Sequence, residues 1–475
     1  MTDVAPPPEG RWRVYWRRIK IAFWSLALLA AIAACAFAWI EMNASPVQAH
    51  YLTELAQEMH FELGTGISDS IRFPAHGPFD ERYGYVALDS LQQRLAGRSF
   101  GVAAQARISP RMAEWMDHGL FPPYREKTQA GLAVLDCAGE ELFRVRYPER
   151  IYSSFDQVPR LLVDSLLFIE NRELLSNEYA AKNPAIEWDR FAKAALDQVI
   201  HKLNPDHEAP GGSTLATQIE KYRHSPDGRT PSGEEKLRQM ASASLRAYSG
   251  GEDTSAVRRQ LVVDYLNTVP LAARSGYGEV IGMGDGMWAW YGREFDEVNK
   301  LLKSDSAALA ARARVYKQAL SLMISQRRPS GYLAGDLSEL EQLTNTYLRL
   351  MATAGVIDPG LRDAALAIPL AQHQGTLAAP RASFVSRKAA NAARTHLASL
   401  LGVRQLYELD RYDLAATSTL DSQLQRTVTA KLREISQPEA AAAAGLMDKR
   451  LLAGSDPSKV IYSFTLYEAL RDANV

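Results

Sequence analysis

Residues 209–225, APGGSTLATQIEKYRHS, place a hydroxyl, an amide and an ammonium group at helical spacing. The GGST stretch is typical of a tight turn in which Ser213 or Thr214 caps a helix. Thr214, Gln218 and Lys221 follow one another at i, i+4 and i+7, so they share one face. This face, at a capped N-terminus, suits an anionic oxygen-rich ligand such as a phosphate; an ordinary solvated helix face is the alternative for this stretch alone. An adjacent face is apolar and consists of Leu215, Ile219 and Tyr222.

A transfer reaction on a phosphate-bearing substrate also needs a base and further positive charge. Glu170 follows the almost wholly apolar run 165–169, so we expect it to be partly buried and suited to accept a proton. The competing interpretation is a surface glutamate paired with Arg172. The stretch GEEKLRQM adds Lys236 and Arg238, although a charged helix face is more often simply solvated.

The elements that must position these residues are mostly helices. Apolar periodicity predicts that the bulk of 155–330 is α-helical, with loops rich in Gly and Ser. Before it, GLAVLDCAGEELFRVRYP alternates on both sides of Cys-Ala-Gly and predicts a β-hairpin. The glycines of SGYGEVIGMGDG match no nucleotide-binding pattern and predict a flexible loop. One further helix is predicted at FAKAALDQVIHKL, with an apolar face of Leu196, Val199, Ile200 and Leu203.

The first forty residues predict a membrane anchor. RWRVYWRRIK carries five basic residues and precedes a run of twenty residues without charge. About twenty apolar residues span a bilayer, whereas a cleaved signal peptide, the alternative, has an apolar region of about 7–15. The basic residues are expected in the cytoplasm, with Trp24 and Trp39 at the two interfaces and everything after about residue 42 outside.

Composition sets the remaining limits. The chain has 475 residues, 47% of them hydrophobic and 23% charged, which is a folded composition with room for two or three domains. The formal net charge of −1 gives no basic field for nucleic acid, and no nucleic-acid partner is expected. Cys35 lies in the apolar run, so a disulfide with Cys137 is not expected. Neither HExxH, CxxC nor a Walker loop occurs.

Read in order, several segments resemble the five motifs of glycosyltransferase family 51, the peptidoglycan glycosyltransferase domain of class A penicillin-binding proteins and monofunctional transglycosylases. The resemblance covers roughly residues 131–335. GGSTLATQIEKY is similar to the second and most specific motif. The other four motifs are matched more loosely by PRLLVDSLLFIENRELLSNEY, EKLRQM, RRQLVVDYLNTVPLAARSGYG and ALSLMISQRRPSGY.

This resemblance implies a lysozyme-like, mainly α fold on the outer surface of the cytoplasmic membrane. The implied activity polymerises lipid II into glycan strands, with inversion and release of undecaprenyl pyrophosphate. Glu170 is then the catalytic base. The implied substrate-binding residues are Arg172, Ser213, Thr214, Gln218, Lys221, Lys236, Arg238, Gln239 and Asn267. The implied partners are lipid II, nascent glycan strands, the membrane and other cell-wall synthesis proteins. A divalent cation, Mg²⁺ or Mn²⁺, is expected on the pyrophosphate without assigned protein ligands, and no organic cofactor is expected.

Four departures from the family pattern stand out. The acidic partner beside the base is Asn171 here, and the histidine of the first motif is Asn177. In the third motif the arginine is Glu235, and the glutamate that is the family's second essential carboxylate is Gln239. A glutamine side chain neither ionises nor binds a metal as a charged ligand. The alternative to an active transferase is therefore an inactive relative that binds lipid II or glycan strands as a scaffold. A third interpretation is a lytic enzyme that cleaves glycan strands.

The expected organisation has five parts. The predicted segments are a cytoplasmic basic tail at 1–20, a membrane anchor at 21–41, a membrane-proximal small α/β region at 42–130, the transferase-like domain at 131–335 and a final region at 336–475. In this last region YDLAATSTLDSQLQRTVTAKL resembles the strand and helix that open a transpeptidase domain. No SxxK or KTG follows residue 400, so penicillin binding is not expected from these residues.

Overall fold

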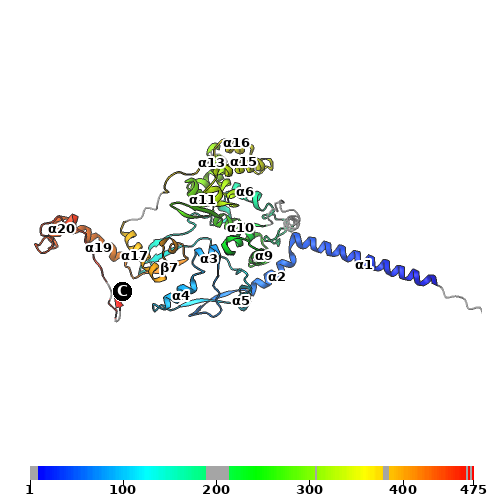
Figure 1. The fold of residues 1–475 in the computed structure, drawn as a ribbon, viewed down its shortest axis with the longest axis horizontal. Helices are drawn as coiled ribbons and strands as arrows, with labels where there is room; N and C mark the ends of the chain where they lie inside the picture. Colours follow the sequence, from blue (N-terminus) through cyan, green and yellow to red (C-terminus); the bar gives the residue numbers. More distant parts are fainter. Residues whose placement is uncertain are drawn as a thin grey trace, which may run out of the picture.

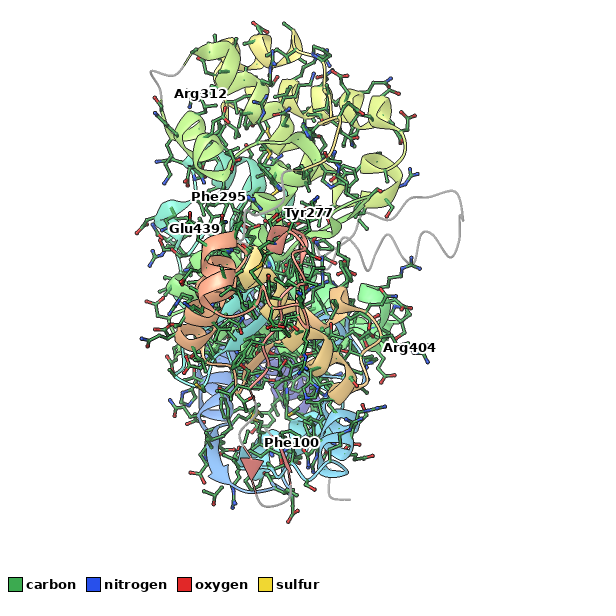
Figure 2. The ribbon with its side chains drawn as sticks, turned by 90° about the vertical axis from the view of Figure 1, so that its left-hand side faces the viewer. Phe100, Tyr277, Phe295, Arg312, Arg404 and Glu439 are labelled. Carbon is green, nitrogen blue, oxygen red and sulfur yellow. The ribbon has the colours of Figure 1, made fainter. Side chains whose placement is uncertain are left out.

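The computed structural model describes residues 9–188, 213–304, 308–377 and 384–466, with the short stretches 469–470 and 473–474. The described chain is mainly helical with few strands, as the sequence predicts. The helix predicted at FAKAALDQVIHKL lies outside the described residues. Two views give the layout: α1 projects from one side of the body and α19 and α20 extend from the other (Figure 1), and Phe100 and Arg312 lie toward opposite ends (Figure 2).

Helix α1 (Glu9–Ala44) contains the predicted apolar run. Its stretch Tyr15–Ala44 is long and apolar enough to cross a membrane, with a mean hydropathy of 2.3. This finding is consistent with an anchor or a signal sequence. Both Cys35 and Cys137 are free thiols, as expected.

The membrane-proximal region is a small α/β unit. Strands β1 (Phe61–Thr65) and β2 (Ala104–Ile108) pair antiparallel, with Phe61 opposite Ile108. Four short helices belong to the same part of the chain, and the Ser109 side chain caps the last one. These helices are α2 (Pro46–Gln57), α3 (Pro78–Arg82), α4 (Leu88–Ala96) and α5 (Pro110–Asp117). Helix α2 packs on α9 of the transferase domain through Ala56 and Leu245, so the region is attached to that domain directly.

The transferase-like domain predicted from the sequence is built around one large apolar core. Its central helix α13 (Leu309–Ser325) is buried along most of its length and contacts α6, α11, α12, α14, α15 and α16. Burying a large apolar side chain stabilises the fold by ~1.5–3 kcal/mol, so this core fixes the helices that position the site. The other helices are α6 (Arg160–Glu170), α8 (Leu215–His224), α9 (Gly233–Ala247), α10 (Ser255–Thr268), α11 (Gly282–Tyr291), α12 (Phe295–Lys303), α14 (Pro329–Leu333), α15 (Leu337–Thr353) and α16 (Pro359–Leu366).

The predicted hairpin forms, but its third strand comes from far along the chain. Strands β3 (Leu132–Leu135) and β4 (Glu141–Arg144) pair antiparallel, and β7 (Leu414–Thr417) joins β3 in parallel. Leu132 and Val134 pack with Leu409 in a core separate from that of the transferase helices. The remaining C-terminal elements are α17 (Phe384–Leu401), α18 (Leu406–Leu409), α19 (Ser422–Glu434), α20 (Pro438–Ala443), β8 (Ala469–Leu470) and β9 (Ala473–Asn474). The strand and helix expected from the transpeptidase resemblance correspond to β7 and α19.

The glycine-rich segment predicted to be a flexible loop is ordered instead. Strands β5 (Pro270–Arg274) and β6 (Gly278–Ile281) form a hairpin that leads directly into α11. Gly282 has a φ of +76° and lies so close to Asn267 that a Cβ atom would be 2.4 Å from its carbonyl oxygen. A Cβ on Gly284 would similarly meet the Arg150 carbonyl oxygen at 2.2 Å. These glycines permit close packing of the backbone rather than mobility.

A buried ionic cluster links the membrane-proximal region to the transferase helices. The Glu126 carboxylate pairs with Arg223 at 2.9 Å, with His224 at 2.7 Å and with Arg246 at 3.1 Å. His224 also contacts Asp80 at 2.8 Å through its other ring nitrogen. Burial alone lowers the pKa of His224, but Glu126 and Asp80 outweigh it and raise the pKa to about 9. The cluster therefore holds His224 protonated at neutral pH.

Candidate active site

Glu170 lies at the end of α6, where the chain leaves the core. The apolar side chains of the helix pack inward, and Glu170 itself is only 8% exposed. Its two carboxylate oxygens each accept a hydrogen bond from an amide: Gln218 Nε2 donates to Oε2 at 2.7 Å and Gln326 Nε2 donates to Oε1 at 2.9 Å. These two donors hold the orientation of the buried carboxylate, which is therefore fixed in place.

Helix α8 supplies Gln218 because its start is firmly capped. The Thr214 hydroxyl accepts from the Thr217 amide at 3.3 Å, and the Thr217 hydroxyl accepts from the Thr214 amide at 2.9 Å. This reciprocal arrangement is a capping box. Thr214 is 1% exposed, and its hydroxyl caps the start of α8 in this structure. Gln218, on the same helix, contacts the Glu170 carboxylate. The predicted apolar face is confirmed, with Leu215 and Ile219 buried in the core.

Positive charge gathers beside the start of α8. Lys236 Nζ donates to the Ser213 hydroxyl at 2.8 Å, which joins α9 to the segment before α8. Burial, and after it the charge of Lys221, lowers the pKa of Lys236 to about 8. Burial also lowers the pKa of Lys221, although the Glu170 carboxylate opposes the effect. Two partly desolvated ammonium groups near a buried carboxylate form an electropositive site that an anionic ligand would stabilise.

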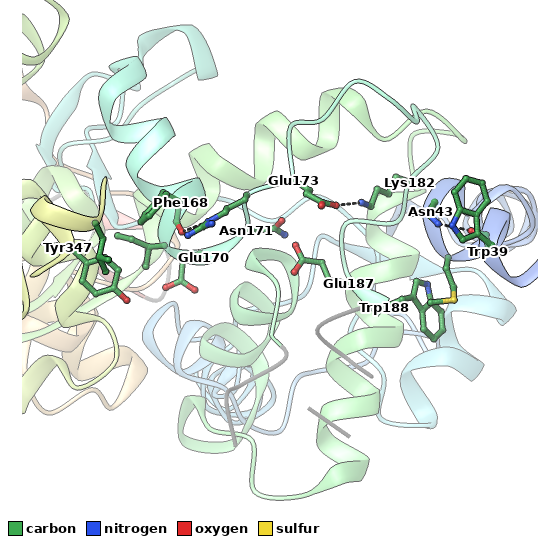
Figure 3. Close-up of a pocket in the computed structure, with 14 residues that line it drawn as sticks. Trp39, Asn43, Phe168, Glu170, Asn171, Glu173, Lys182, Glu187, Trp188 and Tyr347 are labelled. Carbon is green, nitrogen blue, oxygen red and sulfur yellow. Dashed lines mark hydrogen bonds and ion pairs between the residues drawn. The ribbon is translucent and has the colours of Figure 1, made fainter. Parts of the chain in front are cut away.

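A cavity of about 700 Å³ opens beside Glu170. Figure 3 shows its residues, which come from the C-terminal end of α1, from the end of α6 and the segment after it, and from α15. The wall includes Trp39, Met42 and Asn43 of α1, opposite the site carboxylate along the cavity. The apolar N-terminal helix and the candidate base therefore face one continuous space.

Several predicted site residues serve other contacts. Gln239 is fully buried, and its Nε2 donates to Ser225 Oγ and Thr230 Oγ1, both at 2.9 Å. Arg238 pairs with Glu235 at 2.9 Å. These two positions of the third motif are thus engaged within the protein.

Two other predicted residues, Asn267 and Arg172, make well-defined contacts. Asn267 binds the backbone of Tyr152 twice: its Oδ1 accepts from the amide at 2.9 Å and its Nδ2 donates to the carbonyl at 2.8 Å. These two hydrogen bonds support the fold around the site. Arg172 lines the cavity, and its guanidinium lies 4.2 Å from the centre of the Phe168 ring.

The structure adds three residues that sequence reasoning missed. Gln326 follows α13 and reaches Glu170 from 156 positions away. Glu187 lines the cavity, and Tyr265 is a buried tyrosine whose pKa is raised by burial and then by the charge of Glu170. Tyr265 and Gln326 both lie within stretches that resemble family motifs, RRQLVVDYLNTVPLAARSGYG and ALSLMISQRRPSGY. No local signal could have placed Gln326 beside Glu170 or marked Glu187.

This geometry defines a class of protein: a helical enzyme-like domain with one oriented buried carboxylate, two adjacent lysines and a cavity that reaches an apolar terminal helix. The comparison with protein families agrees. The transglycosylase family model matches residues 138–352, and this part of the chain is a glycosyltransferase family 51 domain. No curated protein matches the chain.

For a pyrophosphate-linked donor, which the family resemblance implies, the lysine pair predicts an alkaline limit to binding. Lys236 loses its proton as the pH rises through about 8, and with it the attraction for a pyrophosphate. We expect the KM for a pyrophosphate-linked donor to rise about tenfold between about pH 7 and pH 9. The Lys236→Arg variant keeps its charge throughout this range, so its KM should stay flat. An equally steep rise in the arginine variant would show that another group titrates. Initial rates across this pH range provide the measurement.

Proposed function

We propose that this protein is a membrane-anchored peptidoglycan glycosyltransferase that polymerises lipid II. The observation that carries the proposal is the Glu170 carboxylate, buried yet open to the cavity and held by two amide donors, within a transglycosylase family domain. Helix α1 anchors the chain in the cytoplasmic membrane, with its basic end in the cytoplasm and the domain outside.

The proposed reaction joins an acceptor hydroxyl to the anomeric carbon of a lipid-linked donor. Glu170 removes the proton of the acceptor 4-hydroxyl as its oxygen forms the new bond to the anomeric carbon from the opposite side of the leaving group, which inverts the configuration. The bond from that carbon to the pyrophosphate oxygen breaks, and the lipid pyrophosphate leaves with both bonding electrons. Lys221 and Lys236 stabilise the charge that develops on it.

The lipid portion of the substrate explains why the end of α1 forms part of the cavity wall. Trp39 and Met42 are apolar and lie where the anchor meets the domain. A substrate that keeps its polyprenyl chain in the bilayer can then place its pyrophosphate and sugars in the cavity. A divalent cation enters this proposal on the pyrophosphate oxygens only. Among the described residues no three His, Cys, Asp or Glu side chains form a group able to hold a metal, and no step depends on the ion.

The test is lipid II polymerisation by the detergent-purified full chain, with Mg²⁺ or Mn²⁺ present and products separated as glycan ladders on a gel. Ladders support the proposal. The second candidate, a scaffold that binds lipid II without turnover, is favoured by one observation: Gln239, at the position of the family's second carboxylate, is sealed from solvent. Retained lipid II binding without any ladder would establish the scaffold instead.

A further inference from the structure

The end of α1 that points away from the body carries an exposed surface that the proposed reaction does not use (Figure 1). Four large apolar side chains share one face of the helix there, because their spacing is i, i+3, i+4 and i+7. They are Trp12, Tyr15, Trp16 and Ile19, and all four are exposed. The indole rings of Trp12 and Trp16 pack edge to face, with their centres 6.0 Å apart. The result is an apolar, mainly aromatic stripe along the helix.

Positive charge lies on both sides of this stripe. Arg17 and Lys20 are three residues apart and flank the stripe on one side, and Arg18 flanks it on the other. All three side chains are exposed. No acidic residue lies within four positions of any of them, so no carboxylate of α1 neutralises their charge. We call the stripe and these three cations, Trp12 with residues 15–20, the basic–aromatic surface.

The length of α1 sets the depth of this surface in a bilayer. The uncharged run of twenty residues, 21–40, spans about 30 Å at about 1.5 Å per residue, which equals the thickness of the hydrocarbon core. Glu41 follows the run, and its carboxylate accepts hydrogen bonds from the amides of Val47 at 2.9 Å and Gln48 at 3.0 Å. Glu41 is therefore held where α1 meets the body. With Glu41 at one boundary of the core, Lys20 lies at the other, and the helix continues beyond it without a break.

The lipid headgroups are the layer in which such a surface is stabilised. They extend about 5–8 Å beyond the core, and Arg17 is only about 4.5 Å further along the helix than Lys20. The three cations therefore lie at the depth of the lipid phosphates. Basic residues at this depth are attracted to anionic lipids, and tryptophan and tyrosine rings are enriched there. A solvated helix face, the alternative, would leave four large apolar side chains in water, which the hydrophobic effect disfavours.

We propose that the basic–aromatic surface binds anionic glycerophospholipids of the bilayer, with the lipid phosphates on Arg17, Arg18 and Lys20 and the aromatic rings against the glycerol region. Charge complementarity and continuity with the apolar run favour a lipid over a soluble anion, because a lipid holds its phosphate at the depth of the cations. The inference rests on α1 being a membrane anchor, as in the proposed function, and is independent of the transfer reaction. It gives the anchor a selectivity that an apolar helix alone lacks.

The test compares two lipids that have the same acyl chains but different headgroup charge, phosphatidylglycerol and phosphatidylcholine. The detergent-purified full chain is mixed with equal amounts of both, and native mass spectrometry measures the ratio of the bound lipids. We expect phosphatidylglycerol to be preferred about fivefold, the effect of one basic residue at a membrane surface. The triple variant Arg17→Gln/Arg18→Gln/Lys20→Gln should bind both lipids almost equally. Arg17→Lys/Arg18→Lys keeps the charge and should retain the preference within about twofold.

Helix α19 provides the matched control, because it is exposed and extends from the opposite side of the body (Figure 1). Arg426→Gln/Lys431→Gln/Arg433→Gln removes the same charge as the triple variant of α1, and its preference should stay within about twofold of the wild type. Trp12→Ala/Trp16→Ala tests the aromatic stripe. This variant should bind less of both lipids and leave their ratio unchanged, because the rings contact a lipid without distinguishing its charge.

Two results would overturn the inference: a wild type without any preference, or a triple variant of α1 that prefers phosphatidylglycerol as strongly as the wild type does. The same spectra give the mass of the chain, and a mass that lacks α1 would refute the anchor and this inference together. Unchanged melting temperatures exclude misfolding as the cause of a lost preference.

The outcome is separable from that of the polymerisation assay. A lipid preference that depends on Arg17, Arg18 and Lys20 in a chain that forms no glycan ladder supports this surface and refutes the transferase. Ladders from a chain that binds both lipids equally support the transferase and refute this surface.

Discussion

Glu170→Gln should lower the rate of lipid II polymerisation by about 10²–10⁴-fold, the range expected when a general base is lost. The amide is nearly isosteric with the carboxylate but cannot accept the proton of the acceptor hydroxyl. Its neighbours Gln218 and Gln326 present amide groups that can turn to meet it, so the fold should persist. Single-turnover rates with labelled lipid II, measured at saturating substrate, separate the chemical step from binding.

Glu173→Gln is the appropriate comparison for this variant. Glu173 lies three residues further along, is largely exposed and pairs with Lys182 at 2.8 Å. We expect its rate to remain within about threefold of the wild type, since exposed ion pairs contribute little. A Glu170→Gln protein that still polymerises at the rate of the control would refute the assignment of Glu170 as the base.

Glu126→Gln should destabilise the protein by about 3–5 kcal/mol, because it removes the carboxylate that pairs with buried Arg223 and leaves His224 and Arg246 with one carboxylate partner fewer. The substitution would leave Arg223, His224 and Arg246 crowded together in the interior. For a domain of this size we expect the melting temperature to fall by roughly 10 °C. Thermal unfolding followed by circular dichroism in detergent measures the change.

An exposed pair provides the control for the cluster. Glu434 pairs with Lys431 at 2.8 Å, and both side chains are more than half exposed. Glu434→Gln should change stability by less than about 1 kcal/mol. Equal melting temperatures for the two variants would show that the cluster contributes no more than a surface pair.

The cluster also sets a pH window for stability. The pKa of His224 is raised from 6.5 to about 9. Its contribution to the stability of the fold is therefore complete below pH 6.5 and is lost as the pH rises through about 9. Burial alone raises the pKa of Glu126, but the three neighbouring cations outweigh burial and lower this pKa below the usual 4.5. The contribution of Glu126 to the stability of the fold is therefore present above pH 4.5 and is lost in acid. Thermal unfolding of the wild type should therefore show declining stability on both sides of this window.

The sequence alone predicted much of the local structure of the candidate site because the relevant patterns are local. The i, i+4, i+7 spacing placed Gln218 and Lys221 on one face of α8, and the apolar run before Glu170 predicted its burial at the end of α6. Both expectations match the structure. Alternation likewise predicted the β3–β4 hairpin. Helical and strand periodicity depend on neighbours within a few residues, which a sequence displays directly.

Contacts between distant segments were decided only by the tertiary structure. Gln326 reaches Glu170 across 156 positions, and β7 joins β3 across nearly 300 residues. The glycines of 275–286 suggested mobility, yet Gly282 and Gly284 are required where two backbones meet closely. The sequence shows that Gln239 stands where the family has a carboxylate. The burial of Gln239 against Ser225 and Thr230 follows from packing. The position of Glu187 at the cavity also follows from packing. Packing depends on which surfaces meet in three dimensions, and no spacing along one chain encodes that directly.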